Sequence, residues 1–331
     1  MSGESLATGI LEGDRGALSQ AITLIESTRP EDQAEADRLL AAVEPRTGGS
    51  HRVGISGVPG VGKSTLIDRL GEQLVQQGHR VAVLAVDPSS TVSGGSILGD
   101  KTHMARLGGL DDAYIRPSPS AQTLGGVGSR TREAMLLCEA AGYDVVLIET
   151  VGVGQSETLV ADMVDTFVVL LLPGGGDELQ GIKKGIMEIA DIVAVNKADG
   201  ASLASARETV TEYSGALRYS RRAGANWTPG AVLTSGQTGD GLSELWEQVA
   251  AHRTALADGG ELEARRQRQR IGWMWGLVEE TLVRDFRRAV ATTGLLASVE
   301  QRILAGELTP RAAARELLFA EPSEPVPALD D

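Results

Sequence analysis

The chain contains a glycine-rich segment whose residues could hold phosphate groups. It reads Gly57-Val-Pro-Gly-Val-Gly62-Lys63-Ser64, follows an apolar run at 52–57, and precedes an amphipathic run that extends to about Gln77. A strand, a glycine-rich turn and a helix in this order form the context that a P-loop requires. Glycines allow a tight turn, so that backbone N–H groups and the helix N-terminus can surround phosphate oxygens. The candidate phosphate-contacting residues are Gly57, Gly60, Val61, Gly62, Lys63, Ser64 and Thr65.

Two side chains of this segment have expected chemical roles. Lys63 should reach the β- and γ-phosphates, and the Ser64 hydroxyl should bind Mg2+. The alternative is a glycine-rich turn that only begins a helix, and the complete G-x-x-x-x-G-K-S pattern in this context disfavours it. The segment therefore predicts binding of a nucleoside triphosphate.

A second signature, directly after the apolar run 192–195, identifies the base. It reads Asn196-Lys197-Ala198-Asp199. The Asp199 carboxylate can accept hydrogen bonds from N1–H and the N2 amino group of guanine, whereas adenine has no matching donor pair. Asn196 should brace the loop, and the stem of Lys197 should cover the base. Polar turns after strands are common, but downstream of a P-loop this tetrapeptide predicts GTP and GDP as ligands.

A third loop is expected to contact the base. Ser235 and Gly236 follow the short apolar run 231–233, which is where enzymes of this kind often place such a loop.

Acidic residues beyond two further apolar runs are candidates for the Mg2+ site. Asp87 follows the run 81–86, and the polar loop that continues from it reaches Asp100. A long polar loop at the carboxyl edge of a parallel sheet can hold Mg2+ and respond to the γ-phosphate, although an ordinary surface loop is the alternative. Glu149 lies just beyond the run 144–148, and Gly152 can bond the γ-phosphate through its N–H. We expect Lys63, Glu149 and Asp87 to support catalysis.

The position after Gly152 carries a residue that cannot orient water. Ras-like enzymes have a glutamine there, whereas this chain has Val153. Gln155 is too far along the chain to be a confident substitute. Intrinsic hydrolysis should therefore be slow and should depend on something else that completes the site.

The composition agrees with a cytoplasmic nucleotide-binding protein. The chain has 331 residues and a formal net charge of -14, which argues against nucleic acid or an acidic membrane surface as the main partner. Its single cysteine, Cys138, allows no internal disulfide, and we expect it to be a small buried residue on a helix. The four histidines show no ligand spacing and are expected to be surface or local-contact residues. They are His51, His79, His103 and His252.

The order of patterns along the chain predicts an α/β fold: a P-loop NTPase with a mainly parallel β-sheet flanked by helices. Continuous apolar strands alternating with helices are typical of a parallel sheet that is covered on both faces. We expect an N-terminal helical extension over 1–50, a GTPase domain over 51–256 and a C-terminal helical dimerisation region over 257–320. The tail 321–331 is rich in proline and acid and should be disordered.

The C-terminal helical region has an apolar seam. It consists of Ile271, Trp275, Val278 and Leu282, which recur at helical spacing. The seam should pack on the nucleotide domain, on a second subunit or on both. The basic run 265–270 before it could be a nucleic-acid patch, but in so acidic a chain a solvated or salt-bridging face is favoured.

Several longer segments resemble the ArgK/MeaB family, the G proteins with Glu in the third motif that accompany methylmalonyl-CoA mutase. The resemblance extends over about Leu6 to Leu318. Its motifs are the loop Val86-Asp-Pro-Ser-Ser-Thr, the segment Gly94-Gly-Ser-Ile-Leu-Gly-Asp-Lys-Thr, the stretch Arg116-Pro-Ser-Pro-Ser, the run Leu124-Gly-Gly-Val, the string Glu149-Thr-Val-Gly-Val-Gly-Gln-Ser-Glu and the segment 174–189.

The resemblance implies a homodimeric GTPase that gates the loading of adenosylcobalamin into the mutase and protects or reactivates it. By matching position, the phosphate and Mg2+ site would comprise Lys63, Ser64, Asp87, Asp100 and Glu149. An additional switch that relays the nucleotide state to the mutase would contain Gln180, Lys183 and Lys184. His103 stands where the family more often has Arg. Closely related adenosylcobalamin-dependent acyl-CoA mutases are alternative partners, and we expect the partner to hold the cobalamin.

Two other functions have weaker support. The family has also been labelled a kinase or ATPase for lysine, arginine and ornithine transport, but an ATP user has no need of the guanine-reading Asp199. A GTP-driven nickel metallochaperone would need clustered His or Cys, and the sequence lacks such a cluster.

Overall fold

The structure is a computed structural model that describes residues 2–86, 104–116, 124–150, 156–174, 184–219 and 226–319. It divides into two compact units, Met1–Gly272 and Trp273–Asp331, which we describe separately. The tail 321–331, expected to be disordered, lies outside the described residues, and the domain boundaries stay a prediction.

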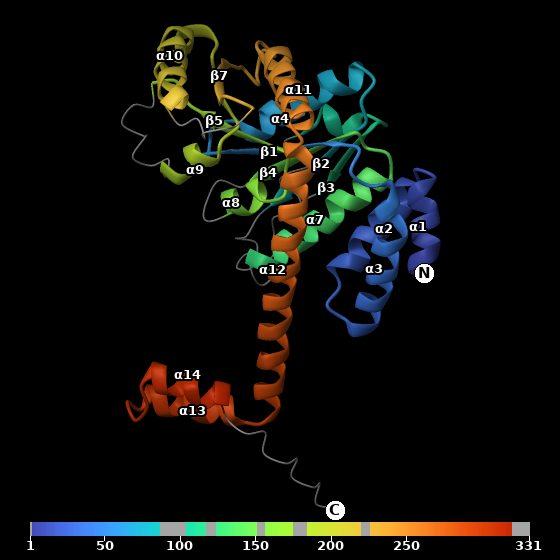
Figure 1. The fold of residues 1–331 in the computed structure, drawn as a ribbon, viewed down its shortest axis with the longest axis vertical. Helices are drawn as coiled ribbons and strands as arrows, with labels where there is room; N and C mark the ends of the chain where they lie inside the picture. The colour runs from blue at the N-terminus through green and yellow to red at the C-terminus, as the bar shows by residue number, and fades with distance from the viewer. Residues whose placement is uncertain are drawn as a thin grey trace, which may run out of the picture. The chain divides into compact units, whose positions relative to one another are not determined.

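The first unit is built on a seven-stranded sheet in which every neighbouring pair is parallel, in the order β3-β2-β4-β1-β5-β6-β7 (Figure 1). This confirms the predicted fold class. The four central strands have completely or largely buried residues, as expected for a sheet covered on both faces. The strands are β1 (His51–Gly57), β2 (Val81–Val86), β3 (Ala113–Arg116), β4 (Val145–Thr150), β5 (Thr166–Leu171), β6 (Ile192–Val195) and β7 (Gly230–Leu233).

Helices cover both faces of the sheet. One face packs against α4 (Lys63–Gln76) and α11 (Leu242–Asp258). The other packs against α7 (Leu124–Ala140), α8 (Ser156–Ala161), α9 (Lys184–Ile189) and α10 (Leu203–Tyr219). Short 3-10 turns connect some of these elements at Glu44–Arg46, Leu107–Gly109 and Gly200–Ser202.

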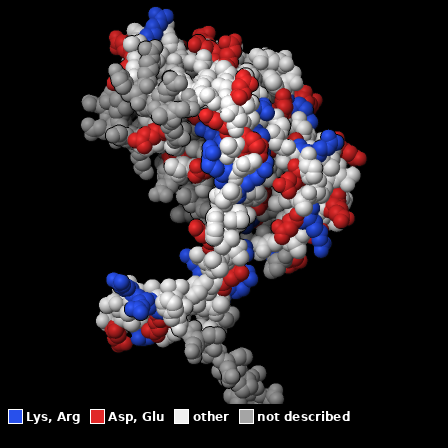
Figure 2. Space-filling view, viewed as in Figure 1, with Lys and Arg blue, Asp and Glu red and all other residues white. Residues whose placement is uncertain are grey.

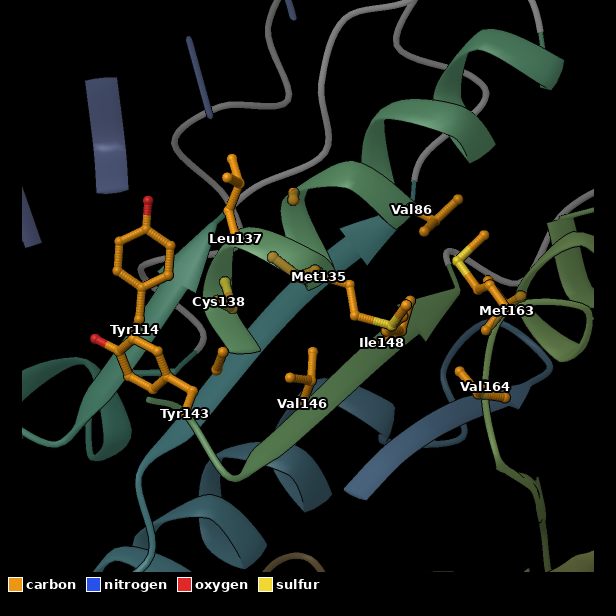
Figure 3. Packing of buried hydrophobic residues seen from close by; sticks show 14 of the residues in the cluster. Val86, Tyr114, Met135, Leu137, Cys138, Tyr143, Val146, Ile148, Met163 and Val164 are labelled. Carbon is orange, nitrogen blue, oxygen red and sulfur yellow. The ribbon is translucent and has the colours of Figure 1, made fainter. Parts of the chain in front are cut away.

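The core on the α7 face contains Cys138 (Figure 3). Its side chain is fully buried beside Met135 and Leu137, and burial raises the pKa of the thiol. The prediction of a small buried residue on a helix is confirmed.

Three N-terminal helices pack against α7: α1 (Gly3–Leu11), α2 (Arg15–Glu26) and α3 (Pro30–Val43). The third begins at Pro30, whose fixed φ suits the first position of a helix. The first begins at the N-cap Ser2, whose hydroxyl accepts from the Ser5 N–H, and it buries Leu6 and Ile10.

A network of ion pairs at the amino ends of the strands binds the first turns of α12 (Glu261–Thr292). Arg266, 6% exposed, binds the Asp165 carboxylate at 2.7 Å, and Asp165 directly precedes β5. Arg266 also donates to the Gly48 and Ser50 carbonyls, in the linker that precedes β1. Arg265 binds Asp191, the residue before β6. The first turns of α12 are therefore tied to the sheet and to the linker.

The basic run 265–270 thus forms salt bridges, as predicted, although Arg266 is buried rather than solvated. Basic and acidic side chains lie together around the first turns of α12 (Figure 2). Arg52, in β1, forms a second buried ion pair with Glu139. The Glu139 carboxylate also accepts hydrogen bonds from the Ser50 hydroxyl and from the Gly48 N–H.

The second unit comprises the rest of α12 with α13 (Leu295–Leu304) and α14 (Pro310–Phe319). The seam residues Trp275 and Leu282 are 56% and 65% exposed in the single chain. Among the described residues, no helix is long and apolar enough to cross a membrane.

The Arg266 pair gives a stability prediction. We expect Arg266→Ala to lower the free energy of unfolding by about 3–5 kcal/mol, because it leaves the buried Asp165 charge without its partner. Urea denaturation of the whole chain measures this. Arg268→Ala removes an exposed charge two residues along the same helix and should change stability by no more than about 0.5 kcal/mol. Equal effects of the two variants would contradict the role of the network.

Candidate functional site

The glycine-rich segment joins β1 to α4, as predicted. Gly60 and Gly62 have φ angles of 79° and 93°, in the left-handed region that glycine tolerates. A Cβ at Gly62 would lie 2.8 Å from Nδ2 of Asn196. The glycine there allows the loop to approach the Asn196 side chain closely. The side chain of Val61, between these two glycines, is fully buried.

Lys63 is the first residue of α4, and its side chain turns back over the loop. Its Nζ donates to the Gly57 carbonyl at 2.9 Å and to the Val58 carbonyl at 3.3 Å. Burial lowers the pKa of Lys63, while the charges of Glu149 and Glu157 oppose that effect. The ammonium group therefore lies where an incoming phosphate could take the place of carbonyl acceptors.

The next residue contacts an acid from a neighbouring strand. The Ser64 hydroxyl donates to Oε1 of Glu149 at 2.7 Å, and Glu149 is buried near the end of β4. The last residue of β4, Thr150, donates to the Ser56 hydroxyl at 2.9 Å, next to Gly57. These two bonds join the phosphate loop to the carboxyl end of β4. Other predicted members of this site lie outside the described residues: Asp87, Asp100, Gly152 and Val153.

The residues predicted to read guanine lie together beside the phosphate loop. Asn196 donates to the Val61 carbonyl at 2.8 Å and accepts from the Gly236 N–H at 3.1 Å. Lys197 has a φ of 60° and donates from Nζ to the Gly60 carbonyl at 2.7 Å. A Cβ at Gly236 would meet the backbone nitrogen of Leu66 at 2.8 Å, so this loop packs directly on α4.

The Asp199 carboxylate is held by Ser235. The Ser235 hydroxyl donates to Oδ2 of Asp199 at 2.5 Å and accepts from the Thr238 N–H at 3.1 Å. Among the described residues, no hydrogen bond reaches its other oxygen, Oδ1, which could accept from a ligand's donor groups. Ser235 thus positions the predicted base-reading acid.

All these residues lie at one edge of the sheet, because parallel strands end on the same side. β1, β4, β6 and β7 end at or just before the segments that contain Gly57, Glu149, Asn196 and Ser235. In open α/β folds, ligands bind at this carboxyl edge. The arrangement can hold a phosphate chain at the N-terminus of α4 and a base between two polar loops.

The sequence model of a family described as methylmalonyl-CoA mutase-associated GTPase MeaB matches residues 18–291. The chain belongs to the MeaB family. It is therefore a P-loop GTPase that binds guanine nucleotides and hydrolyses GTP.

Individual proteins also resemble this chain. A probable GTPase of Mycobacterium tuberculosis is 54% identical over 315 residues, which are 95% of this chain and 94% of that protein. A mouse protein named methylmalonic aciduria type A homolog, mitochondrial, is 48% identical and covers 96% of this chain and 79% of its own length. A crystal structure described as LAO/AO transport system kinase has a TM-score of 0.73 and 38% identity, over 96% of each chain.

The structure also adds residues that the sequence analysis of this MeaB-family GTPase did not single out. They are Ser56, Thr150, Glu157 and Thr238. An acid in the first turn of a helix, three residues beyond a glycine-rich motif, was the available signal for Glu157. No sequence pattern predicted the contact between the Ser56 and Thr150 hydroxyls, because it exists only when β1 pairs with β4.

Other expected residues have simpler surroundings. His252 is buried and forms a local contact with the Thr166 hydroxyl at 2.8 Å. His103, Gln155, Gln180 and Lys183 lie outside the described residues, and Lys184 is the first residue of α9. Within the described ranges, no group of three or more His, Cys, Asp or Glu side chains could hold a metal ion.

The Asp199 geometry leads to a specificity prediction. We expect Asp199→Asn to weaken the preference for GTP and to favour xanthosine nucleotides, because an amide can donate to the extra carbonyl of xanthine. Competition between GDP and XDP for a fluorescent nucleotide measures the change. Asp258→Asn, an exposed change at the end of α11, is the matched control. If Asp199→Asn discriminates between GDP and XDP as the unaltered protein does, Asp199 is not the base-reading residue.

Proposed function

We propose that this GTPase gates the loading of adenosylcobalamin into methylmalonyl-CoA mutase, or into a related adenosylcobalamin-dependent acyl-CoA mutase, and protects or reactivates that enzyme. The observation that carries the proposal is the match over residues 18–291 to a family described as mutase-associated. The mouse relative, named after methylmalonic aciduria, supports it. In this proposal the protein works in the cytoplasm, and the mutase holds the cobalamin.

In this proposal, different residues of the nucleotide site bind the phosphates and the base. Lys63 exchanges its two carbonyl acceptors for the β- and γ-phosphates, and the backbone of the glycine-rich loop surrounds them. Asn196, Lys197 and Asp199 hold the guanine from one loop, while Ser235 and Gly236 approach from the other.

Ser64 and Glu149 suit Mg2+, because they present a hydroxyl and a carboxylate oxygen side by side, and Mg2+ prefers hard oxygen ligands. Asp87 and Asp100 would complete the set. A bound Mg2+ would neutralise charge that develops on the phosphates.

A homodimer forms part of the proposal. The seam of α12 exposes Trp275, Val278 and Leu282 in a single chain, and a large apolar stripe on a helix is stabilised by a partner surface. Within the second unit these side chains lie on the helix α12 ahead of α13 and α14.

The dimer can be tested on the seam itself. Light scattering at micromolar concentration should give twice the mass of one chain, and Leu282→Asp should shift the mass toward the monomer, because it introduces a charge into an apolar contact. Glu280→Lys also changes charge, but its position is about half a helical turn from Leu282, and it should leave the mass unchanged. A monomeric mass for the unaltered chain would exclude this use of the seam.

A second candidate is an ATPase or kinase associated with lysine, arginine and ornithine transport. The description of the solved structure with a TM-score of 0.73 favours it. The hydrogen bond between Ser235 and Asp199 disfavours it, because it orients an acid for which adenine offers no pair of donors.

Phosphate release from GTP and from ATP separates these candidates. The purified protein should hydrolyse GTP slowly and ATP hardly at all, since Val153 cannot orient water and Asp199 selects guanine. Addition of an adenosylcobalamin-dependent methylmalonyl-CoA mutase from the same source should raise the GTP rate. The control is the same mutase mixed with the Lys63→Ala variant. Preference for ATP, or a GTP rate indifferent to a mutase that does not bind, would favour the transport function.

A further inference from the structure

Two hydroxyl side chains are buried side by side where β1 and β4 end. The Thr150 hydroxyl donates to Oγ of Ser56 at 2.9 Å, and both side chains are fully buried. Ser56 directly precedes Gly57 of the phosphate loop, and Thr150 directly follows Glu149. The bond therefore joins the two strands at the residues that lead into the proposed phosphate and Mg2+ sites.

The neighbouring strands show that packing alone does not require hydroxyls here. In the register of the sheet, Val86 of β2 lies opposite Thr150, and Val169 of β5 lies opposite Ser56. Both valines belong to the apolar core on the α7 face of the sheet. Valine and threonine have nearly the same shape and differ in the hydroxyl group, so an apolar side chain could continue this row. The two hydroxyls interrupt an otherwise apolar row at its two central strands.

Folding stability gives little reason for the hydroxyl pair. A buried hydrogen bond contributes only modestly to stability, because both groups give up hydrogen bonds to water when the chain folds. Replacement of both partners by apolar groups of the same shape can be nearly neutral or stabilising. Because neither side chain is exposed, the pair would act on the nucleotide site through its neighbours in the chain.

The neighbour that matters is Glu149, which points to the opposite face of β4 from Thr150, since successive side chains of a strand alternate. Its register partner in β1 is Ile55, which belongs to the core on the α4 face. On that face its Oε1 accepts from the Ser64 hydroxyl at 2.7 Å, in the first turn of α4. The end of β4 is therefore held on both faces, by Ser64 on one and by Ser56 on the other.

Binding of Mg2+ would affect these two bonds differently. The oxygens of Ser64 and Glu149 form the proposed Mg2+ site, so the hydrogen bond between them would rearrange when the ion binds. The bond between Thr150 and Ser56 lies on the other face and takes no part in that exchange. It can keep the end of β4 attached to the phosphate loop throughout. A ligand group that is already held in place loses less conformational freedom on binding.

We propose that Ser56 and Thr150 are positioning residues for the Mg2+ site. Their bond fixes the end of β4 to the start of the phosphate loop, so that the Glu149 carboxylate is held beside Ser64. The inference rests on the Mg2+ role proposed above for Ser64 and Glu149, and it depends neither on the mutase nor on the dimer. Removal of the two hydroxyls should weaken Mg2+ binding and leave metal-free nucleotide binding intact.

The test compares the double variant Ser56→Ala/Thr150→Val with the unaltered protein. Binding of a fluorescent, non-hydrolysable GTP analogue is measured during a Mg2+ titration, with EDTA as the metal-free reference. The variant should need about tenfold more Mg2+ to reach half of the Mg2+-dependent gain in affinity, because contacts that orient a metal ligand typically have effects of this size. Its affinity in EDTA should stay within about twofold, and its urea midpoint should be nearly unchanged.

A conservative variant separates positioning from packing. Thr150→Ser keeps the hydroxyl but removes a buried methyl group, so it should keep the Mg2+ requirement of the unaltered protein and lower the urea midpoint. The double variant should show the reverse, a changed Mg2+ requirement at a nearly unchanged midpoint. Thr211→Val removes an exposed hydroxyl on α10, is the matched control and should change neither quantity.

Two outcomes for the double variant would overturn the inference. One is a Mg2+ requirement equal to that of the unaltered protein. The other is a loss of analogue affinity in EDTA together with a lowered urea midpoint, which would make the pair a purely structural contact. Ser64→Ala distinguishes a failure of the Mg2+ site itself: it should raise the Mg2+ requirement, and if it does not, the site is misassigned and the inference falls with it.

Discussion

The side chain of Asn196 joins the loops from which the nucleotide site is built. Its amide nitrogen donates to the Val61 carbonyl in the phosphate loop, and its amide oxygen accepts from Gly236 in the third loop. Asn196 is 2% exposed, so an unmade bond here would leave a buried polar group without water. The separation between the phosphate end and the base end of the site therefore depends on this buried amide, together with the bond from Lys197 Nζ to the Gly60 carbonyl.

The two edges of the sheet carry different kinds of polar group. At the amino edge, buried acids are matched by arginines, as in the pair between Asp165 and Arg266, and the network holds the first turns of α12. At the carboxyl edge, Lys63 rests on neutral backbone carbonyls, and Glu149 accepts from the Ser64 hydroxyl. Paired charges give a rigid attachment, whereas a cation held only by neutral carbonyls is suited to a charged ligand. The fold thus places the attachment of α12 at one edge of the sheet and the nucleotide site at the other.

Sequence patterns predicted the fold well where they report local geometry. The β6 strand has its predicted bounds, and the phosphate loop joins a strand to a helix as expected. The short edge strand β3 was missed, because four residues of mixed burial give little periodic signal. Arg266 was expected on an exposed face and is buried, since its environment comes from Asp165, far away in the sequence.

The central claim is that the loops joined by Asn196 form a site for guanine nucleotides. Equilibrium binding of fluorescent GDP and ADP to the purified protein in Mg2+ tests this most directly. A site in which Ser235 holds the Asp199 carboxylate toward the base should reject a base that lacks the donors, so GDP should bind more tightly by about 1,000-fold or more. Affinities for GDP and ADP within tenfold of one another would contradict the account.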